Sequence, residues 1–175
     1  LFSTALFGAS FILIIKATED FFVKNNNFSQ NLSHFAFSIF ILSILLNGVL
    51  SKEFSANMKY GDEIKINESS IKFVNLETIN EKNYKSIITG FQIIDKNGKI
   101  ENFNPEIRIF NQPEILTSEA DIKSDIFSDK FLVVNLLKDD GYFNVRYQIK
   151  PFMLWIWASI VLLSIGGMLS FFRRV

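Results

Sequence analysis

Residues 151–172, PFMLWIWASIVLLSIGGMLSFF, carry the strongest membrane signal in this sequence. The run contains no charged residue, and about 20 mainly apolar residues suffice to cross the roughly 30 Å hydrocarbon layer of a bilayer. A buried helix of a soluble protein is shorter than this uncharged run. We therefore predict a transmembrane helix with Trp155 and Trp157 at the interface that amphipathic rings prefer. Gly166 and Gly167 would let another helix approach closely.

Two other apolar runs precede this helix. Residues 31–51 hold no charged residue, so we predict a second transmembrane helix there. Polar groups within a membrane face neighbouring helices rather than lipid, and this run contains Asn31, Ser33, His34, Ser38, Ser43 and Asn47. Residues 1–16 lie in an apolar run that no basic residue precedes, which is unlike a signal peptide. We expect them to be the remainder of a truncated transmembrane helix in a longer protein.

The orientation follows from the excess of basic residues on the cytoplasmic side of membrane proteins. Arg173 and Arg174 follow the last helix directly, so we predict that residues 173–175 form a cytoplasmic tail. Residues 17–30, which are polar and balanced in charge, are then a loop on the cytoplasmic side. Residues 52–150 lie on the opposite side of the membrane. That side is the periplasm of a bacterial inner membrane or the intermembrane space of a mitochondrion, since the richness in Phe, Ile, Lys and Asn indicates an AT-rich genome of either origin.

The segment between the last two helices has the pattern of an antiparallel β domain. It carries 14 basic and 16 acidic residues. Apolar and polar residues alternate along its last part, as in a half-buried strand, and Asn97-Gly98 and Asp140-Gly141 are hairpin turn signals. Strands are expected at residues 63–67, 70–76, 84–94, 99–103, 106–110, 130–137 and 142–149. Residues 117–127 are acidic and are expected to contain a helical turn.

These elements define the predicted fold as an α+β membrane protein. It has about three transmembrane helices, the first of them truncated, and an extracytoplasmic antiparallel β domain at residues 52–150, inserted between the last two. About seven short strands in roughly 100 residues predict a small sandwich or barrel.

The composition excludes several kinds of site. The sequence has no cysteine, which excludes a disulfide framework, a zinc–thiolate site and a thiol nucleophile. Its net charge of zero argues against nucleic-acid binding, which needs a basic surface. There is no phosphate-binding glycine loop, nucleophile elbow or dinucleotide fingerprint, so we expect no catalytic residue in this chain.

Two groups of charged residues are further candidates for a functional site. The first group is a set of carboxylates that could bind a cation, although we favour a solvated loop: Glu119, Asp121, Asp125, Asp139 and Asp140. Glu106 and Arg108 are two residues apart, which places them on one face of a strand. We expect them to form a surface pair rather than a catalytic pair.

The single histidine, His34, is the candidate for cofactor binding. It lies in a predicted transmembrane helix with no other ionisable residue up to Leu50, and ionisable groups within membranes are functional candidates. One hypothesis is a neutral imidazole hydrogen-bonded to a neighbouring helix. The other is an axial ligand to haem iron, which helix bundles hold well. One histidine fills one axial position, so the second ligand would come from a helix outside this sequence.

The end of the β domain and the last helix resemble one protein family. Residues 147–157, YQIKPFMLWIW, followed by Gly166 and Gly167, resemble the segment YYKPFVRWIW…GG of the CcmF family of cytochrome c-type biogenesis proteins. Residues 105–110 and 117–122 resemble further segments of that family's β domain. The order and spacing of these segments agree along the whole chain.

This resemblance implies a function in haem handling. Members of the family are haem lyase subunits that support thioether formation between haem and the Cys-x-x-Cys-His motif of apocytochrome c, and they carry a haem b in the membrane. His34 matches the membrane histidine that ligates this haem b from one side. The implied partners are the rest of the haem-lyase chain, a haem chaperone of the CcmE type, CcmH-type subunits and apocytochrome c. The implied location is the inner membrane.

Other properties of the family are not carried by this chain. The tryptophan-rich segment that holds the incoming haem and the family's other histidines are absent from the sequence. The chain alone is therefore not expected to catalyse ligation. The alternative function is a membrane-anchored β-domain adaptor or structural subunit of a transporter or secretion complex, without a cofactor.

The predicted topology can be tested at Asn97, in the first hairpin turn. A cysteine at this position should react with a membrane-impermeant thiol reagent that is added from the periplasmic or intermembrane-space side. Labelling that occurs only from the cytoplasmic side would overturn the predicted orientation.

Overall fold

The computed structural model describes residues 2–23, 28–66, 69–137 and 141–172. The chain divides into two compact units. The helical unit comprises Leu1–Ser51, Ser124–Asp129 and Lys150–Val175, and the sandwich unit comprises Lys52–Lys123 and Lys130–Ile149.

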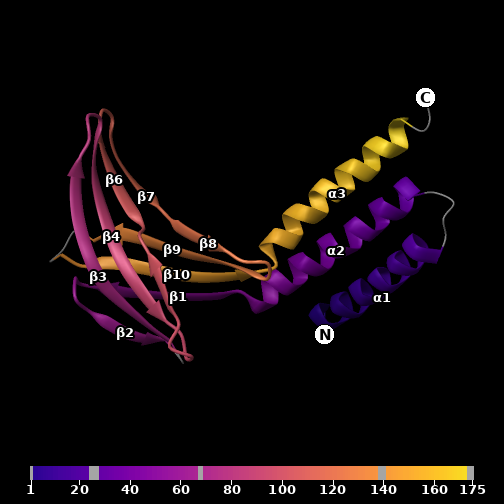
Figure 1. The fold of residues 1–175 in the computed structure, drawn as a ribbon, viewed down its shortest axis with the longest axis horizontal. Helices are drawn as coiled ribbons and strands as arrows, with labels where there is room; N and C mark the ends of the chain where they lie inside the picture. The colour runs from indigo at the N-terminus through magenta and orange to yellow at the C-terminus, as the bar shows by residue number, and fades with distance from the viewer. Residues whose placement is uncertain (1, 24–27, 67–68, 138–140, 173–175) are drawn as a thin grey trace. The chain divides into compact units, whose positions relative to one another are not determined.

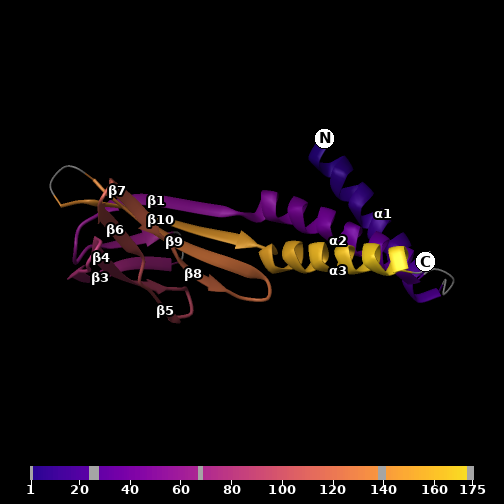
Figure 2. The ribbon, with the colours of Figure 1, turned by 90° about the horizontal axis from the view of Figure 1, so that it is seen from above.

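Three α-helices make up most of the helical unit: α1 (Phe2–Val23), α2 (Phe28–Leu50) and α3 (Met153–Phe172). Helix α2 packs against both α1 and α3, and it runs antiparallel to each of them (Figures 1 and 2). Among the described helices, α2 and α3 are long and apolar enough to cross a membrane. They coincide with the last two apolar runs of the sequence.

The loop expected at residues 17–30 is wrong over most of its length. Helices α1 and α2 leave only residues 24–27 between them, and these lie outside the described residues. No proline or glycine interrupts the second half of α1, and such residues are what commonly end a helix. Phe21 of α1 also stacks on Phe35 of α2, with ring centroids 5.4 Å apart. Apolar packing therefore continues past the charged residues near the end of α1.

Ten β-strands are described, and they form two antiparallel sheets. One sheet has the order β1-β10-β9-β8, and the other has the order β2-β3-β4-β6-β7 with β5 paired to β4. The sheets form separate layers (Figure 1), which makes the domain a sandwich rather than a barrel. The strands are β1 (Lys52–Met58), β2 (Glu63–Ile66), β3 (Ser69–Asn80), β4 (Tyr84–Ile94), β5 (Ile100–Phe103), β6 (Glu106–Asn111), β7 (Glu114–Glu119), β8 (Asp121–Ser124), β9 (Ser128–Leu136) and β10 (Phe143–Pro151).

The seven predicted strands are confirmed, with changes at their ends. The turn at residues 95–98 is also present, because Gly98 has a φ of 76° and the Asp95 N–H donates to the Lys99 carbonyl at 3.0 Å. The second predicted turn falls mostly on residues 138–140, outside the described residues. Gly141, which follows them, has a φ of 71°, a left-handed conformation that favours glycine.

The helical turn expected at residues 117–127 is wrong. These residues contribute to the end of β7 and to β8, and β9 begins directly after them at Ser128. β7 pairs with β6, with Leu116 opposite Ile109 and Ser118 opposite Ile107. Cross-strand pairing and burial decide strand formation more strongly than intrinsic preference does. β1 was not predicted either.

The core between the two sheets is largely aromatic. Phe73 of β3 is fully buried, stacks on Phe91 with centroids 4.4 Å apart and meets Phe143 of the other sheet edge-on at 5.5 Å. β3 bulges between Phe73 and Asn75, opposite Gly90. A Cβ on Gly90 would lie 2.7 Å from the Asn75 Cβ, so this close approach requires glycine. The remaining core residues are Met58, Ile71, Ile93, Phe103, Ile107, Leu132, Val134, Val145 and Tyr147.

Replacing Phe73 by alanine should destabilise the sandwich by about 3–5 kcal/mol, because the change removes a buried aromatic ring and leaves a cavity. A urea titration of the purified protein, followed by circular dichroism, measures this loss. Ile79→Ala is the control, since Ile79 lies on the same strand with 42% of its surface exposed. Equal effects of the two substitutions would contradict the assignment of Phe73 to the core.

Candidate functional site

A close contact between α2 and α3 fixes the position of the helix that carries the histidine. Gly166 is buried, and a Cβ on it would collide with the Ser33 hydroxyl and lie 3.1 Å from both the Ser29 carbonyl oxygen and the Ser33 nitrogen. Ser33 Oγ in turn donates to the Ser29 carbonyl at 3.0 Å. The sequence predicted that Gly166 and Gly167 would permit close helix approach. Gly166 does so, whereas a Cβ on Gly167 would meet nothing within 4 Å.

The opposite side of α2 is held by α1. Besides the stacked Phe21–Phe35 pair, the Asn31 side-chain amide donates to the Asp20 carbonyl at 2.6 Å. Farther along, Ser38 is buried and its hydroxyl donates to the His34 carbonyl at 2.7 Å. The polar residues predicted on α2 are thus used mainly for helix packing and for hydrogen bonds to backbone carbonyls.

His34 lies on a face of α2 that neither α1 nor α3 covers. Gln30, His34, Phe37 and Ile44 are all exposed, and their spacing of four, three and seven residues places them on one face of a helix. Within the described part of the chain, the imidazole makes no hydrogen bond or ion pair. Since α2 is apolar enough to span a membrane, an ionisable side chain at this position is a candidate functional group.

The imidazole of His34 can offer a nitrogen to a metal, but no metal-binding group of side chains surrounds it among the described residues. No group of three or more His, Cys, Asp or Glu side chains that could hold a metal ion occurs among the described residues. A neutral imidazole is nevertheless a common axial ligand of haem iron. One imidazole could fill one axial position of a haem iron.

The carboxylates that were candidates for a cation site make local hydrogen bonds. Asp121 accepts from the Asn104 N–H at 2.7 Å, and Asp125 accepts from the Ile126 N–H at 2.7 Å. Glu119 accepts from the Thr117 hydroxyl at 3.2 Å. Asp139 and Asp140 lie outside the described residues. The hydrogen bonds of the three described carboxylates are those of turns and strand ends.

Glu106 and Arg108 form the expected pair on the surface of β6. Arg108 Nε and Nη2 each donate to one carboxylate oxygen of Glu106, at 2.9 and 2.8 Å, and the Ser86 hydroxyl donates to Glu106 at 2.6 Å. The hydrogen bond from Arg108 holds the pKa of the Glu106 carboxyl below its ordinary value. Both charges are satisfied by each other, so neither is free for acid–base catalysis.

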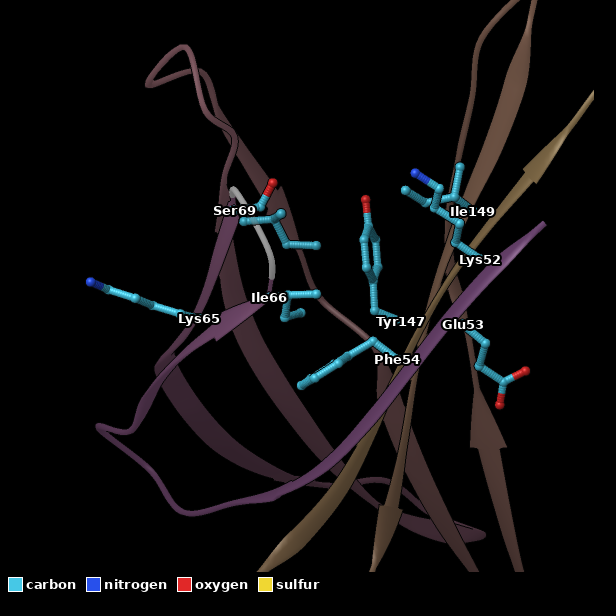
Figure 3. A pocket seen from close by; sticks show the side chains of 9 residues that line it. Lys52, Glu53, Phe54, Lys65, Ile66, Ser69, Tyr147 and Ile149 are labelled. Carbon is cyan, nitrogen blue, oxygen red and sulfur yellow. The ribbon is translucent and has the colours of Figure 1, made fainter. Parts of the chain in front are cut away.

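A cavity of about 590 Å³ opens at one end of the sandwich. Tyr147 stands in it between the two sheets, with Phe54 and Ile66 beside its ring (Figure 3). Burial raises the pKa of Tyr147 to about 12, with a further contribution from the charge of Glu101. Tyr147 is therefore a neutral hydroxyl at physiological pH. The other lining residues are Lys52, Glu53, Lys65, Ser69, Ile93 and Ile149.

Apolar and polar residues both line this cavity. In Figure 3, the Lys65 and Glu53 side chains point away from Tyr147. The sequence did not predict the cavity because its walls come from five strands, β1, β2, β3, β4 and β10, and the last of these lies far from the others along the chain. Alternation along residues 142–149 did indicate that Tyr147 faces inward.

The fold and the apolar helices define a class of protein: a β sandwich inserted in the chain between two helices that are able to span a membrane. The family model described as CcmF C-terminal beta-sandwich matches residues 49–151. The chain belongs to the CcmF family, as its resemblance to the YYKPFVRWIW…GG segment predicted.

Relatives from bacteria agree with this assignment. Cytochrome c-type biogenesis protein ccl1 of Rhodobacter capsulatus is 30% identical over 116 residues, which cover 66% of this chain and 18% of the relative. Cytochrome c-type biogenesis protein CcmF of Escherichia coli is 27% identical over 141 residues, which cover 80% and 22%. The chain thus spans about a fifth of the length of these relatives.

A solved structure shares the fold. It is described as Cytochrome c Heme Lyase CcmF, and it superposes with a TM-score of 0.62 at 15% identity. The match covers 80% of this chain and 23% of that one.

Replacing Gly166 by leucine should lower the thermal stability of the protein in detergent, because the new side chain collides with α2. Overpacking of this kind typically costs about 1–3 kcal/mol. Gly167→Leu is the matched control, since a Cβ on Gly167 has open space. If both variants melted at the temperature of the unmodified protein, the tight α2–α3 contact would be refuted.

Proposed function

We propose that this chain is the C-terminal part of a cytochrome c haem-lyase subunit, which supports the covalent attachment of haem to apocytochrome c. Membership of the CcmF family supports this proposal, together with the names of the relatives. The subunit is a multi-pass protein of the bacterial inner membrane or the mitochondrial inner membrane. Its sandwich lies on the periplasmic or intermembrane-space side.

The proposed site is His34, as one axial ligand of a haem b within the membrane. The observation that carries it is the exposed imidazole on a face of α2 that α1 and α3 leave uncovered. A bound haem b would supply one-electron redox chemistry at this position. The second axial ligand lies outside this chain, on another helix of the same protein.

Residues of this chain position the imidazole. Ser33 is fixed against Gly166, and Phe35 is fixed against Phe21. His34 lies between these two anchors in sequence, so the rotation of α2 that exposes its ring is set from both sides. We expect the imidazole to offer one nitrogen to iron while the other donates a hydrogen bond to an oxygen of a neighbouring helix.

A helix that starts at Asn31, as the apolar run at residues 31–51 predicts, would place His34 within about one turn of its start. α2 begins at Phe28, so His34 lies about 9 Å along the helix at 1.5 Å per residue. This distance is nearly two turns rather than one. In the proposed orientation, the site still lies towards the cytoplasmic leaflet, which suits an electron arriving from the quinone pool or from the cytoplasmic side.

The sandwich is proposed to act by positioning rather than by chemistry. Glu106 and Arg108 of the sandwich pair with each other, and the tyrosine hydroxyl in its cavity is neutral. The proposed partners are apocytochrome c, a CcmE-type haem chaperone, CcmH-type subunits and the rest of the haem-lyase chain. Alanine at Glu119 or at Asp121 should therefore leave the haem content of the full-length protein intact.

Replacing His34 by alanine should remove the b-type haem spectrum from the purified full-length protein, because this part of the chain holds no other histidine that can replace the ligand. The protein should still insert into the membrane, since alanine is tolerated in hydrocarbon. Gln30→Ala is the matched control: it lies one turn earlier on the same exposed face and should keep the spectrum. Exogenous imidazole is expected to restore part of the haem to the His34→Ala protein.

Retention of a normal bis-histidine spectrum by His34→Ala would reject the ligand assignment. The hydrogen-bonded histidine would then be the better account of this residue. If the unmodified full-length protein contained no haem at all, the adaptor or structural subunit without a cofactor would replace the haem-lyase proposal.

A further inference from the structure

The tip of the β8–β9 hairpin, Ser124–Asp129, belongs to the helical unit although its flanking strands lie in the sandwich sheets. We call these six residues the β8–β9 tip. The Asp125 N–H donates to the Ser128 carbonyl at 2.9 Å and closes the turn. The tip is therefore a defined turn with a partner outside the sandwich.

Two hydrogen bonds attach the β8–β9 tip to the start of α3. The indole N–H of Trp155 donates to the Ile126 carbonyl at 2.9 Å, and the Phe152 N–H donates to the Phe127 carbonyl at 2.8 Å. Both bonds use backbone oxygens of the tip. The side chains of Ile126 and Phe127 remain 56% and 64% exposed.

The composition of the β8–β9 tip differs from that of other described turns in the sandwich. The turn between β4 and β5 is Asp95-Lys96-Asn97-Gly98, and the turn between β3 and β4 is Glu81-Lys82-Asn83. Those turns are polar, as turns in contact with water usually are. The β8–β9 tip instead exposes two adjacent large apolar side chains, which commonly marks a contact surface.

We propose that the β8–β9 tip is a membrane-contacting element, in which Ile126 and Phe127 enter the lipid interface beside the first turn of α3. α3 is apolar enough to span a bilayer, and its first residues include Trp155 and Trp157, of the residue type enriched at the interface. The hydrogen bond from Trp155 places the tip at the depth of this turn. The apolar side chains of the tip therefore continue the surface through which α3 meets lipid.

The contact depends on apolar insertion rather than on attraction to anionic lipid. The lysines that flank the tip are already engaged: Lys130 pairs with Glu101 at 2.6 Å, and Lys123 lies over the Phe103 ring at 5.0 Å. The tip itself carries Asp125 and Asp129, which would repel anionic headgroups. Anionic lipid should therefore not strengthen the membrane contact of the tip.

The test uses the whole protein in nanodiscs, with a cysteine that replaces Phe127 and carries an environment-sensitive fluorophore. The emission of the label at position 127 should be blue-shifted relative to that of the same label at Asn97. Phosphatidylcholine with a nitroxide near its headgroup should quench it more strongly than phosphatidylcholine with a nitroxide at the end of its acyl chain. The same label at Asn97 is the control and should be quenched by aqueous iodide only. Adding phosphatidylglycerol should not increase the lipid quenching at position 127.

A second pair of variants tests whether α3 holds the tip in place. Trp155→Phe removes the indole donor and should weaken the lipid quenching at position 127. Trp157→Phe, with an exposed ring that makes no hydrogen bond to the tip, should leave it unchanged. A label at position 127 that iodide quenches as strongly as at Asn97 would overturn the proposal. Shielding from both iodide and lipid nitroxides would also overturn it, because it would show that another protein segment covers the tip.

Discussion

The pairing of β1 with β10 is the constraint on which the rest of the structure depends. β1 follows α2 directly, and β10 ends where α3 begins, so the two strands carry the chain into and out of the sandwich. They pair antiparallel with Lys52 opposite Ile149. The end of α2 and the start of α3 are thus brought together, and Asn47 of α2 donates to the Pro151 carbonyl at 2.6 Å. A domain of about 100 residues can therefore interrupt a helix pair without separating it.

The helices and the sandwich are held together by two different kinds of packing surface. The helices are assembled through small residues and hydroxyl groups, as in the close approach of Gly166 to Ser33. The sandwich is assembled through stacked aromatic rings around Phe73. His34 belongs to neither packing surface, which leaves its ring available to a group or helix that this chain does not supply. The unused imidazole is the feature that links the architecture to the proposed haem chemistry.

The sequence predicted the elements whose signals are local. The uncharged runs became α2 and α3, and the alternation along residues 142–149 became β10. The acidic segment at residues 117–127 was assigned wrongly, because its strand structure depends on pairing with β6, a neighbour that local composition does not reveal. The length of α1 was underestimated for a similar reason, since the Phe21–Phe35 stack lies beyond the apolar run. His34 could be singled out by its chemistry, whereas its exposure depended on which neighbours pack against Ser33 and Phe35.

The β1–β10 pairing also has a consequence for how the protein is made. β1 is synthesised first in the domain and β10 last, with almost a hundred residues between the partners Lys52 and Ile149. Contacts between such distant segments form late, because closing a long loop costs chain entropy. Until β10 emerges, β1 presents an unpaired strand edge, which is a template for incorrect association. The period between the synthesis of α2 and that of α3 is therefore the vulnerable stage in the biogenesis of this protein, when a chaperone or an assembly partner would have most effect.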